Sequence, residues 1–531
     1  MKNLLLLTLL AGLVLAPGLL GQDLLEEGKK LLEARDFEAA LEKFDAVLES
    51  DENSFEARLG AARCHVGLGD PSTANFHAVK AERLKPDDLD AAVLVGDTFA
   101  AVGREKIAAG GDPTASFEES IIAFKKALRL APKEAKYAGY VGWLAWQIGK
   151  SADSAEAYLK AAEIDPKNAE YPYLAAQRFA DLPDADRALK AIDLAIARDG
   201  KNGVYHNYKG TILQFKQDLP GAGACFAKAL ASANLPDETA GQAAGGAYTV
   251  RAADKNWKGL AEDMAGWVKA HPKSDLAHWW LGYAHFIDGN FKEQLDAFAK
   301  LEKLGGRYLP EAQLYQGIAL AGMGKDKEAI AKFEAAAGHG DYAWSDDQRR
   351  PVFQMRLIVG KYYARGDFDR AVEIAEKHVL PICRRPIDLC GVKQDIGFFL
   401  RDWGAQIDPK GRAAKARTAY EKSRKYYEEA VALFEACGGD LDAKTKAQIQ
   451  NDCGLMYYYY DIKDIETSTR HYEKALEYDP NYDDALLNLA RIHVAAERYA
   501  EAVALLERGS DRGDLVGLLR EARRKLAEGG K

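Results

Sequence analysis

The chain has 531 residues, of which 48% are hydrophobic and 29% charged, and its formal net charge at pH 7 is −9. A chain of this length exceeds one ordinary hydrophobic core, so we expect several domains or one elongated array. The composition argues against a disordered chain, and the acidic balance without a strongly basic block argues against nucleic acid as a partner.

The N-terminus has the pattern of a secretory signal. Lys2 is the only charged residue before Asp23, and an uncharged apolar run over residues 4–16 precedes a Pro-Gly pair at 17–18 that should break a helix. We expect a signal peptide at 1–21, cleaved after Gly21, and a periplasmic or secreted protein whose fold starts at residue 22. An uncleaved segment would be short for a span of about 20 residues, and we expect no other membrane contact.

An internal repeat follows this segment. Gly142 is followed 12, 16 and 19 positions later by Ser154, Tyr158 and Ala161, in the order small, small, bulky, small. The same steps start at Gly28, Ala62, Ala176, Gly210, Gly282, Gly317 and Ala490. The spacing in each unit predicts two helices of about 13 residues joined by a turn. The patterned residues would lie along one stripe of the helix surface. One such pair cannot bury both of its faces, so neighbouring pairs must stack.

Two stretches resemble tetratricopeptide repeats: LGYAHFIDGNFKEQLDAF at 281–298 and HYEKALEYDPNYDDALLNLARIHVAAERYAEAVALLERG at 471–509. The resemblance implies an all-α fold, an alpha-solenoid superhelix of about thirteen TPR-like helix-turn-helix units over residues 22–512. A last amphipathic stretch within 513–531, LVGLLREARRKLAEG, is typical of a C-terminal capping helix with a charged outer face.

The repeat is regular at 22–340 and less regular at 341–512. In the third unit, GREKIAAGGDPTAS at 103–116 inserts about twelve residues between the two helices, and DYAWSDDQRRPV at 341–352 breaks the period. The units at 353–440 carry a proline-containing loop and a long helix from about Arg412 to Cys437. We therefore expect a regular superhelix and a less regular second half with inserted loops.

The cysteines allow two disulfides. Six cysteines in 531 residues are too few for a disulfide scaffold. Cys383 and Cys390 flank an irregular loop and could close it, and Cys437 and Cys453 lie on successive helices and could meet. Neither pair has the spacing of a zinc site or a thioredoxin motif, so we expect no metal.

By resemblance to the family, one stripe of each unit's first helix lines the concave face, which is the usual peptide-binding surface. This stripe holds two aromatic clusters with a polar section between them: Trp143, Trp146 and Tyr173, then Asn207 and Gln214, then Trp279, Tyr283 and Phe286. Trp143 and Tyr283 stand where the family more often has a small polar residue. Partner binding through them and plain packing between repeats both stay open.

Some family members bind C-terminal carboxylates on this face through lysine, asparagine and arginine. The stripe here offers Lys29, Arg63, Asn207 and Arg491, which are too scattered in the sequence to form one pocket. We do not expect that activity.

The sequence carries no glycine-rich phosphate loop and no nucleophile motif, so we expect no enzyme, no catalytic residue and no cofactor. The first hypothesis is an exported scaffold that binds a protein or peptide segment on its concave face. The alternative is a structural subunit or assembly factor of a cell-envelope or secretion complex, held through outer faces and region 341–440. A third hypothesis is a hydrolytic site near 341–412 that uses Asp346 or Asp347.

Overall fold

The computed structural model describes residues 17–340, 342–344, 346–437, 441–458 and 463–529, with backbone alone for 17–20 and 437. In these parts of the chain, 27 α-helices alternate with short connections, and no β-strand is present. The helices pair as thirteen hairpins, from α1 with α2 to α25 with α26, and α27 packs against the last hairpin. The predicted solenoid of about thirteen units with a C-terminal capping helix is confirmed.

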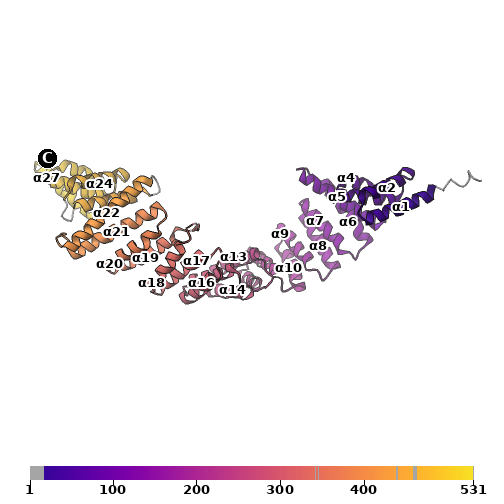
Figure 1. Cartoon of the computed structure of the whole chain (residues 1–531), viewed down its shortest axis with the longest axis horizontal. Helices are drawn as coiled ribbons and strands as arrows, with labels where there is room; N and C mark the ends of the chain where they lie inside the picture. Colours follow the sequence, from indigo (N-terminus) through magenta and orange to yellow (C-terminus); the bar gives the residue numbers. More distant parts are fainter. Residues whose placement is uncertain (1–16, 341, 345, 438–440, 459–462, 530–531) are drawn as a thin grey trace, which may run out of the picture. The chain divides into compact units, whose positions relative to one another are not determined.

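The chain forms two compact units, residues 1–271 and 272–531, each a row of hairpins (Figure 1). Unit 1 contains α1 Pro17–Glu33, α2 Phe37–Ser50, α3 Phe55–Gly67, α4 Pro71–Leu84, α5 Leu89–Ala108, α6 Thr114–Leu130, α7 Ala135–Gln147, α8 Ser151–Ile164, α9 Glu170–Asp181, α10 Ala185–Arg198, α11 Gly203–Phe215, α12 Leu219–Leu230, α13 Asp237–Ala253 and α14 Trp257–Ala270. Unit 2 contains α15 Asp275–Asp288, α16 Phe291–Leu304, α17 Leu309–Gly322, α18 Asp326–Ala337, α19 Pro351–Ala364, α20 Phe368–Ile374, α21 Pro386–Ile407, α22 Ala414–Cys437, α23 Ala443–Tyr458, α24 Ile465–Tyr478, α25 Asp483–Ala495, α26 Tyr499–Leu506 and α27 Gly513–Ala527.

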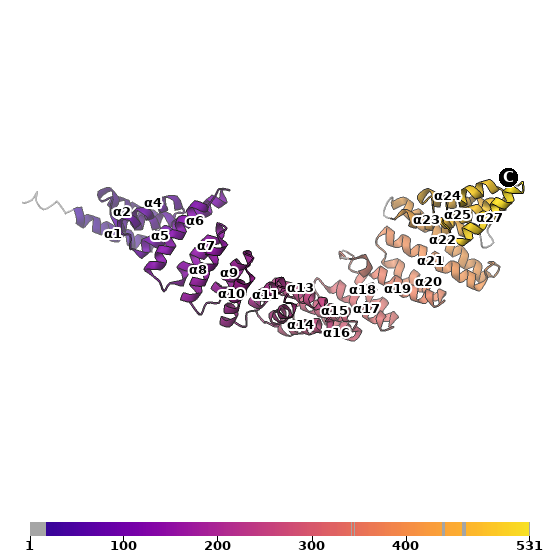
Figure 2. The ribbon, with the colours of Figure 1, turned by 180° about the vertical axis from the view of Figure 1, so that it is seen from behind.

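Three short turns complete unit 2: η1 Asp347–Arg349, the π-helical η2 Ala375–Val379, and η3 Leu380–Ile382. The division that the sequence predicts at residue 340 lies inside this unit and stays a prediction. Figure 2 shows the same two rows of hairpins from behind.

The periodic small and bulky residues are the contacts between helices. A Cβ atom added to Gly28 on α1 would lie 2.9 Å from the ring of Phe44 on α2, and one added to Gly60 on α3 would lie 2.4 Å from that ring. Phe226 on α12 is wedged in the same way between Gly210 on α11 and Gly246 on α13. Each ring therefore joins the first helix of its own hairpin to the first helix of the next one, which explains the repeat.

A serine of the second helix adds a buried hydrogen bond to several hairpins. Ser154 Oγ donates to the carbonyl of Gly142 at 2.6 Å, and Ser423 Oγ donates to that of Gly397 at 2.6 Å. Both serines are fully buried, so the bond prevents an unsatisfied hydroxyl at a closely packed position.

The odd-numbered helices form one side of each unit. Apart from successive helices, contacts join mainly odd-numbered pairs, such as α1 with α3, α15 with α17, and α23 with α25. The pair α12 and α14 is an exception. In a curved stack, the helices on the inner side lie closest together. We call the side formed by the odd-numbered helices the inner side, and the opposite side the outer side.

Two details of the fold differ from the sequence expectation. The insertion at 103–116 does not lie wholly between the two helices, because most of its residues lengthen α5 to 20 residues and α6 to 17 and leave a connection at 109–113. The helix α1 begins at Pro17, before the expected start of the fold at residue 22, and the residues that precede Pro17 lie outside the described part of the chain. Proline is tolerated at the first helical position because the N–H it lacks has no partner there.

The disulfide predicted between Cys383 and Cys390 is also absent from the structure. Cys383 lies between η3 and α21, where its thiol donates to the carbonyl of Val379 at 3.3 Å. Cys390 is inside α21, and its thiol donates to the carbonyl of Ala430 at 3.4 Å. The two thiols thus point to different helices. The pairing predicted between Cys437 and Cys453 is also wrong, because Cys453 is a free, buried thiol whose Sγ lies 3.6 Å from His471 Nε2. The side chain of Cys437 lies outside the described residues.

Candidate partner-binding surfaces

The predicted surface residues all lie on odd-numbered helices, hence on the inner side. In unit 1 they are Trp143 and Trp146 on α7, Tyr173 on α9, and Asn207 and Gln214 on α11; in unit 2 they are Trp279, Tyr283 and Phe286 on α15. Their contacts differ between the two units, and the units are described separately.

In unit 1, Trp143 is mainly a packing residue. Its ring is half-buried, meets the fully buried Phe117 edge to face at 6.0 Å, and packs against the buried clusters of two neighbouring hairpins. Trp143 therefore fills the space between repeats. Its contacts support a role in packing between repeats rather than in partner binding.

Trp146 is more exposed, with 44% of its surface accessible, but its ring already has a partner. The guanidinium of Arg178 on α9 lies 4.6 Å from the ring centroid, and Arg178 also forms a 2.9 Å ion pair with Asp181 on the same helix. Tyr173 packs on Tyr205, with ring centroids 5.0 Å apart. Side chains of the array itself thus cover much of this cluster.

The polar section of unit 1 is not a continuous exposed surface. Asn207 is buried, and its Oδ1 accepts no hydrogen bond from any described residue. Gln214, seven residues later on α11, is half-buried. The two amides offer isolated polar atoms rather than a pocket.

In unit 2, the aromatic residues form one connected group, which we call the aromatic box: Trp279, Tyr283 and Phe286 on α15, Tyr308 at the start of α17, and Tyr315 on α17. Trp279 and Tyr283 are stacked with centroids 5.0 Å apart, and Phe286 meets Tyr315 edge to face at 5.1 Å. Tyr308 lies 6.0 Å from Trp279. The predicted cluster on α15 is therefore half of a larger ring surface that α17 completes.

Polar groups border the aromatic box. Glu311 on α17 accepts hydrogen bonds from Trp279 Nε1 and from the hydroxyl of Tyr342, which lies in the connection between α18 and α19. Arg349, from the end of the same connection, lies over Tyr283 with its Cζ 5.6 Å from the ring centroid. Its Nη1 donates to the hydroxyl of Tyr315 at 3.3 Å. Part of the connection that breaks the period thus rests on the box.

A second site on the inner side of unit 2 is an open pocket of about 670 Å³ that we call the polar pocket. It is lined by residues of four successive odd-numbered helices, α21, α23, α25 and α27. Its polar side chains include Arg401, Gln448, Asn451, Asp452, Asn488 and Arg491. Four helices contributing polar groups to one cavity is an arrangement that packing alone does not require.

Hydrogen bonds between neighbouring helices hold the floor of the polar pocket. Asn488 Nδ2 on α25 donates to Asn451 Oδ1 on α23 at 3.0 Å, and Asn451 Nδ2 approaches Asp452 Oδ1 at 3.4 Å. Arg401 Nη1 on α21 lies 3.9 Å from the same Asp452 oxygen. Arg491 on α25 is exposed and forms no ion pair with a described residue. Its guanidinium is the positive charge of the pocket that is open to a ligand.

Burial raises the pKa of Asp452 to about 6, against the opposing effect of Arg401 and the Asn451 hydrogen bond. Because the carboxyl group is buried, its ionisation lowers the free energy of unfolding. Residues that reduce stability and face a cavity are typical of binding sites.

The polar pocket was not predicted from the sequence, although two of its residues stand at positions typical of the inner side. Asn451 precedes the small residue Gly454 by three positions and Arg401 precedes Gly404 by three, which is also how Tyr173 precedes Ala176 and Asn207 precedes Gly210. Arg491 was considered only together with Lys29, Arg63 and Asn207, none of which lines this pocket, and not together with Asn451 and Asn488, which do. Tyr315 belongs to the aromatic box and Arg349 lies over it. Nothing in the sequence beyond their residue types indicated that they would lie there.

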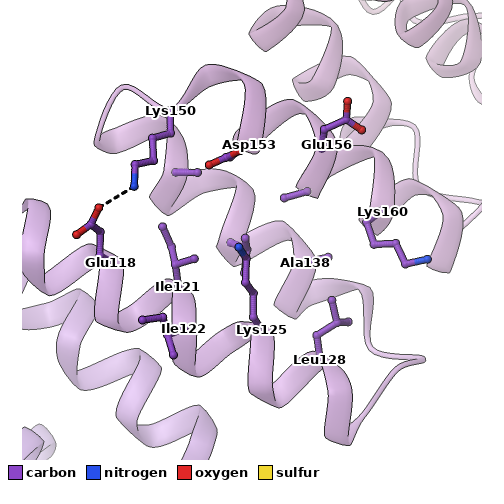
Figure 3. Close-up of a pocket in the computed structure, with 13 residues that line it drawn as sticks. Glu118, Ile121, Ile122, Lys125, Leu128, Ala138, Lys150, Asp153, Glu156 and Lys160 are labelled. Atoms are coloured by element: carbon purple, nitrogen blue, oxygen red, sulfur yellow. Dashed lines mark hydrogen bonds and ion pairs between the residues drawn. The ribbon is translucent and has the colours of Figure 1, made fainter.

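A groove of about 530 Å³ lies on the outer side of unit 1, between α6 and α8 with α7 as its floor (Figure 3). Its apolar residues include Ile121 and Ile122 of α6, and Ile122 is 60% exposed. Charged side chains border the groove, and Lys150 Nζ forms a 2.7 Å ion pair with Glu118 Oε1. The groove therefore combines an apolar floor with charges of both signs.

The two aspartates named for a hydrolytic site are both engaged with arginines. Asp346 and Asp347 are ion-paired, the first with Arg349 at 3.7 Å and the second with Arg350 at 2.9 Å. No group of three or more His, Cys, Asp and Glu residues in the described parts of the chain could hold a metal ion. Burial raises the pKa of the Cys383 thiol to about 12, so this thiol is not a nucleophile at neutral pH.

Among the helices that the structure describes, none combines the length and the apolar character that a membrane span needs.

Comparisons with known proteins agree with the repeat. Family models described as tetratricopeptide repeat match residues 31–96 and 463–523, and a second such model matches 115–169 and 261–308. No curated protein matches the chain.

Solved structures similar to parts of the chain include three that cover different lengths. A crystal structure of MamA protein is 20% identical, covers 35% of this chain and 94% of its own, and has a TM-score of 0.30. A thermophilic TPR protein from Thermus thermophilus is 19% identical, covers 36% and 99%, and has a TM-score of 0.24. A structure of Naa15/Naa10 bound to HypK-THB is 12% identical, covers 96% of both chains, and has a TM-score of 0.35.

The family matches fall in both compact units and at both ends of the described chain. They coincide with hairpins whose small and bulky residues recur at the expected steps. The chain is therefore a tetratricopeptide repeat protein.

Proposed function

We propose that this protein is a non-enzymatic scaffold that binds a segment of a protein partner on the inner side of unit 2. The polar pocket is the observation that carries the proposal. Four helices direct amide, carboxyl and guanidinium groups into one open cavity, and two of these groups, Asn451 and Asn488, are at least nine-tenths buried. Side-chain amides can pair with the N–H and C=O groups of an extended peptide, and Arg491 can pair with a carboxylate.

Capture from an extract of the cells that make the protein tests this proposal. The baits are the unchanged chain, an Arg491→Glu variant and an Arg470→Glu control, in which an exposed arginine on the outer helix α24 is reversed in the same way. We expect a protein that is retained by the unchanged chain and the control but lost from Arg491→Glu. A protein that all three baits retain equally would contradict binding through the polar pocket.

The outer groove of unit 1 supports a second candidate function, that of a structural subunit or assembly factor of a cell-envelope or secretion complex. An exposed isoleucine in an apolar groove bordered by charges suits contact with another folded subunit. An Ile122→Glu bait in the same capture experiment separates the two candidates. Loss of the partner from this bait, with retention by Arg491→Glu, would favour the structural role.

We also propose that the protein is exported, on the pattern of residues 1–21. The described α1 side chains that pack on the first hydrophobic cluster, Leu24, Leu25, Leu31 and Leu32, all follow residue 21, so cleavage there would leave this packing in place. Mass spectrometry of the protein from its natural cell should give an N-terminus at Gln22. An intact N-terminus on a protein found inside the cell would contradict export.

A further inference from the structure

We propose that the aromatic box binds an arginine side chain of the partner, and that Arg349 is an internal occupant which the partner's arginine displaces. This inference rests on the proposed function and specifies the partner segment: it carries an arginine where it passes α15 and α17.

The box has the chemistry of an arginine site because an arginine already lies in it. Arg349 rests 5.6 Å over the ring of Tyr283 and donates to two hydroxyls, those of Tyr315 at 3.3 Å and Tyr283 at 3.5 Å. The Glu311 carboxylate, held by Trp279 and Tyr342, adds negative charge at the border. A planar guanidinium can stack on a ring and donate in two directions together, which an ammonium cannot do.

Arg349 is held weakly enough to be replaced. Its side chain is 40% exposed, and its ion pair with Asp346, at 3.7 Å, joins two residues of the same connection. It comes from the three-residue turn η1 rather than from a repeat helix. These are features of a segment that can detach locally without unfolding the hairpins.

The arginine over Trp146 in unit 1 is held more firmly than Arg349. Arg178 belongs to helix α9, its side chain is only 12% exposed, and it forms a 2.9 Å ion pair with Asp181 one turn along the helix. It cannot leave its ring without loss of helix packing. Both clusters hold an arginine, but only the one in unit 2 is supplied by a replaceable segment.

The test uses the full chain and two fluorescent peptides, GSRGSRGSRG and the same sequence with citrulline in place of arginine. Citrulline keeps the shape of the side chain but has no charge. The proteins are the unchanged chain, Arg349→Gln, and Arg349→Gln with Tyr283→Leu. Arg365→Gln is the matched control, because Arg365 is an exposed arginine of the connection between α19 and α20, which holds no residue of the aromatic box.

We expect Arg349→Gln to bind the arginine peptide about tenfold more tightly than the unchanged chain, because the competing internal side chain is gone. The citrulline peptide should bind at least about tenfold more weakly, Tyr283→Leu should abolish the gain, and Arg365→Gln should match the unchanged chain. If the double variant does not fold by circular dichroism, Tyr283→Phe, which loses one acceptor and keeps the ring, should lose part of the gain.

Equal affinity of Arg349→Gln and the unchanged chain for the arginine peptide, or equal binding of the two peptides, would overturn the inference. The capture experiment with Arg491→Glu tests the polar pocket and not the aromatic box. Failure here with a partner still captured through the polar pocket would reject the arginine assignment and leave the proposed function standing.

Discussion

The inner sides of the two units use the same repeat positions for different purposes. In unit 1, Trp143 fills space between hairpins and Trp146 lies under an arginine of the next inner helix. In unit 2, Tyr283 belongs to an aromatic surface touched by a connecting segment, and the inner helices farther along enclose a polar pocket. The comparison teaches that the stripe position of a residue gives its side of the array. Its neighbours on the adjacent inner helix determine whether it packs or binds.

The largest expected effect is on packing in unit 1. Trp143→Ala should destabilise the protein by about 3 kcal/mol, because it removes a large ring that contacts the cores of two hairpins. Urea denaturation followed by circular dichroism should show an early transition from unit 1. Tyr283→Leu is the matched change in unit 2 and should cost clearly less. A smaller loss from Trp143→Ala than from Tyr283→Leu would break the comparison.

The next effect is a gain of stability in unit 2. Folding raises the pKa of Asp452 from 3.8 to about 6, so the folded state binds more protons than the unfolded state between these values. Stability linked to this group is therefore present below pH 4 and is lost as the pH rises through 6. Asp452→Asn removes the ionisation, and it should raise the free energy of unfolding by about 2 kcal/mol at pH 8.

The same Asp452→Asn change should have little effect at pH 4, where the carboxyl group is neutral in the folded protein. Urea denaturation at the two pH values measures the difference. An equal effect at pH 4 and pH 8 would mean that the buried carboxylate does not carry the cost.

A smaller effect is expected at the exposed edge of the unit 1 cluster. Trp146→Ala removes a ring that is 44% exposed and stacked under Arg178, so the loss should be about 1 kcal/mol or less. If this variant still captures the partner, the Trp146 ring is neither part of the core nor part of the binding surface. The difference between the inner sides of the two units would then be clearer. Loss of the partner would restore a binding role for unit 1.

The smallest effect on stability is expected from Arg491→Glu. The side chain is exposed and has no ion pair with a described residue, so the free energy of unfolding should change by about 0.5 kcal/mol or less. The binding effect should still be large. Denaturation beside the capture experiment checks that loss of the partner is not loss of the fold.

Much of the fold could be predicted from the sequence because its cause is local. Gly142, Ser154 and Tyr158 meet within one hairpin, and the sequence steps between such residues report that contact directly. The insertion at 103–116 was expected between the two helices of its unit, because lengthening of two paired helices leaves the same gap in the period as residues inserted between them. The start of α1 at Pro17 was missed because proline is unfavourable inside a helix but not at its first position.

The binding surfaces were harder to predict because they depend on contacts between repeats. Residue type and stripe position placed Tyr283 and Trp146 on the inner side. They could not show that Arg349, 66 residues from Tyr283, would lie on its ring. They also could not show that Asn451 and Asn488 meet across 37 residues to form the floor of a pocket. Such contacts depend on the three-dimensional rotation of each hairpin relative to the next one.

Photo-crosslinking tests the central claim most directly. A benzophenone amino acid is placed at Gln448, an exposed residue lining the polar pocket on α23, or at Lys422, an exposed residue on the outer helix α22. Irradiation in the cells that make the protein, followed by mass spectrometry, identifies what each position touches. The account predicts a protein adduct from Gln448 and none from Lys422. An adduct from Lys422 alone would contradict binding on the inner side.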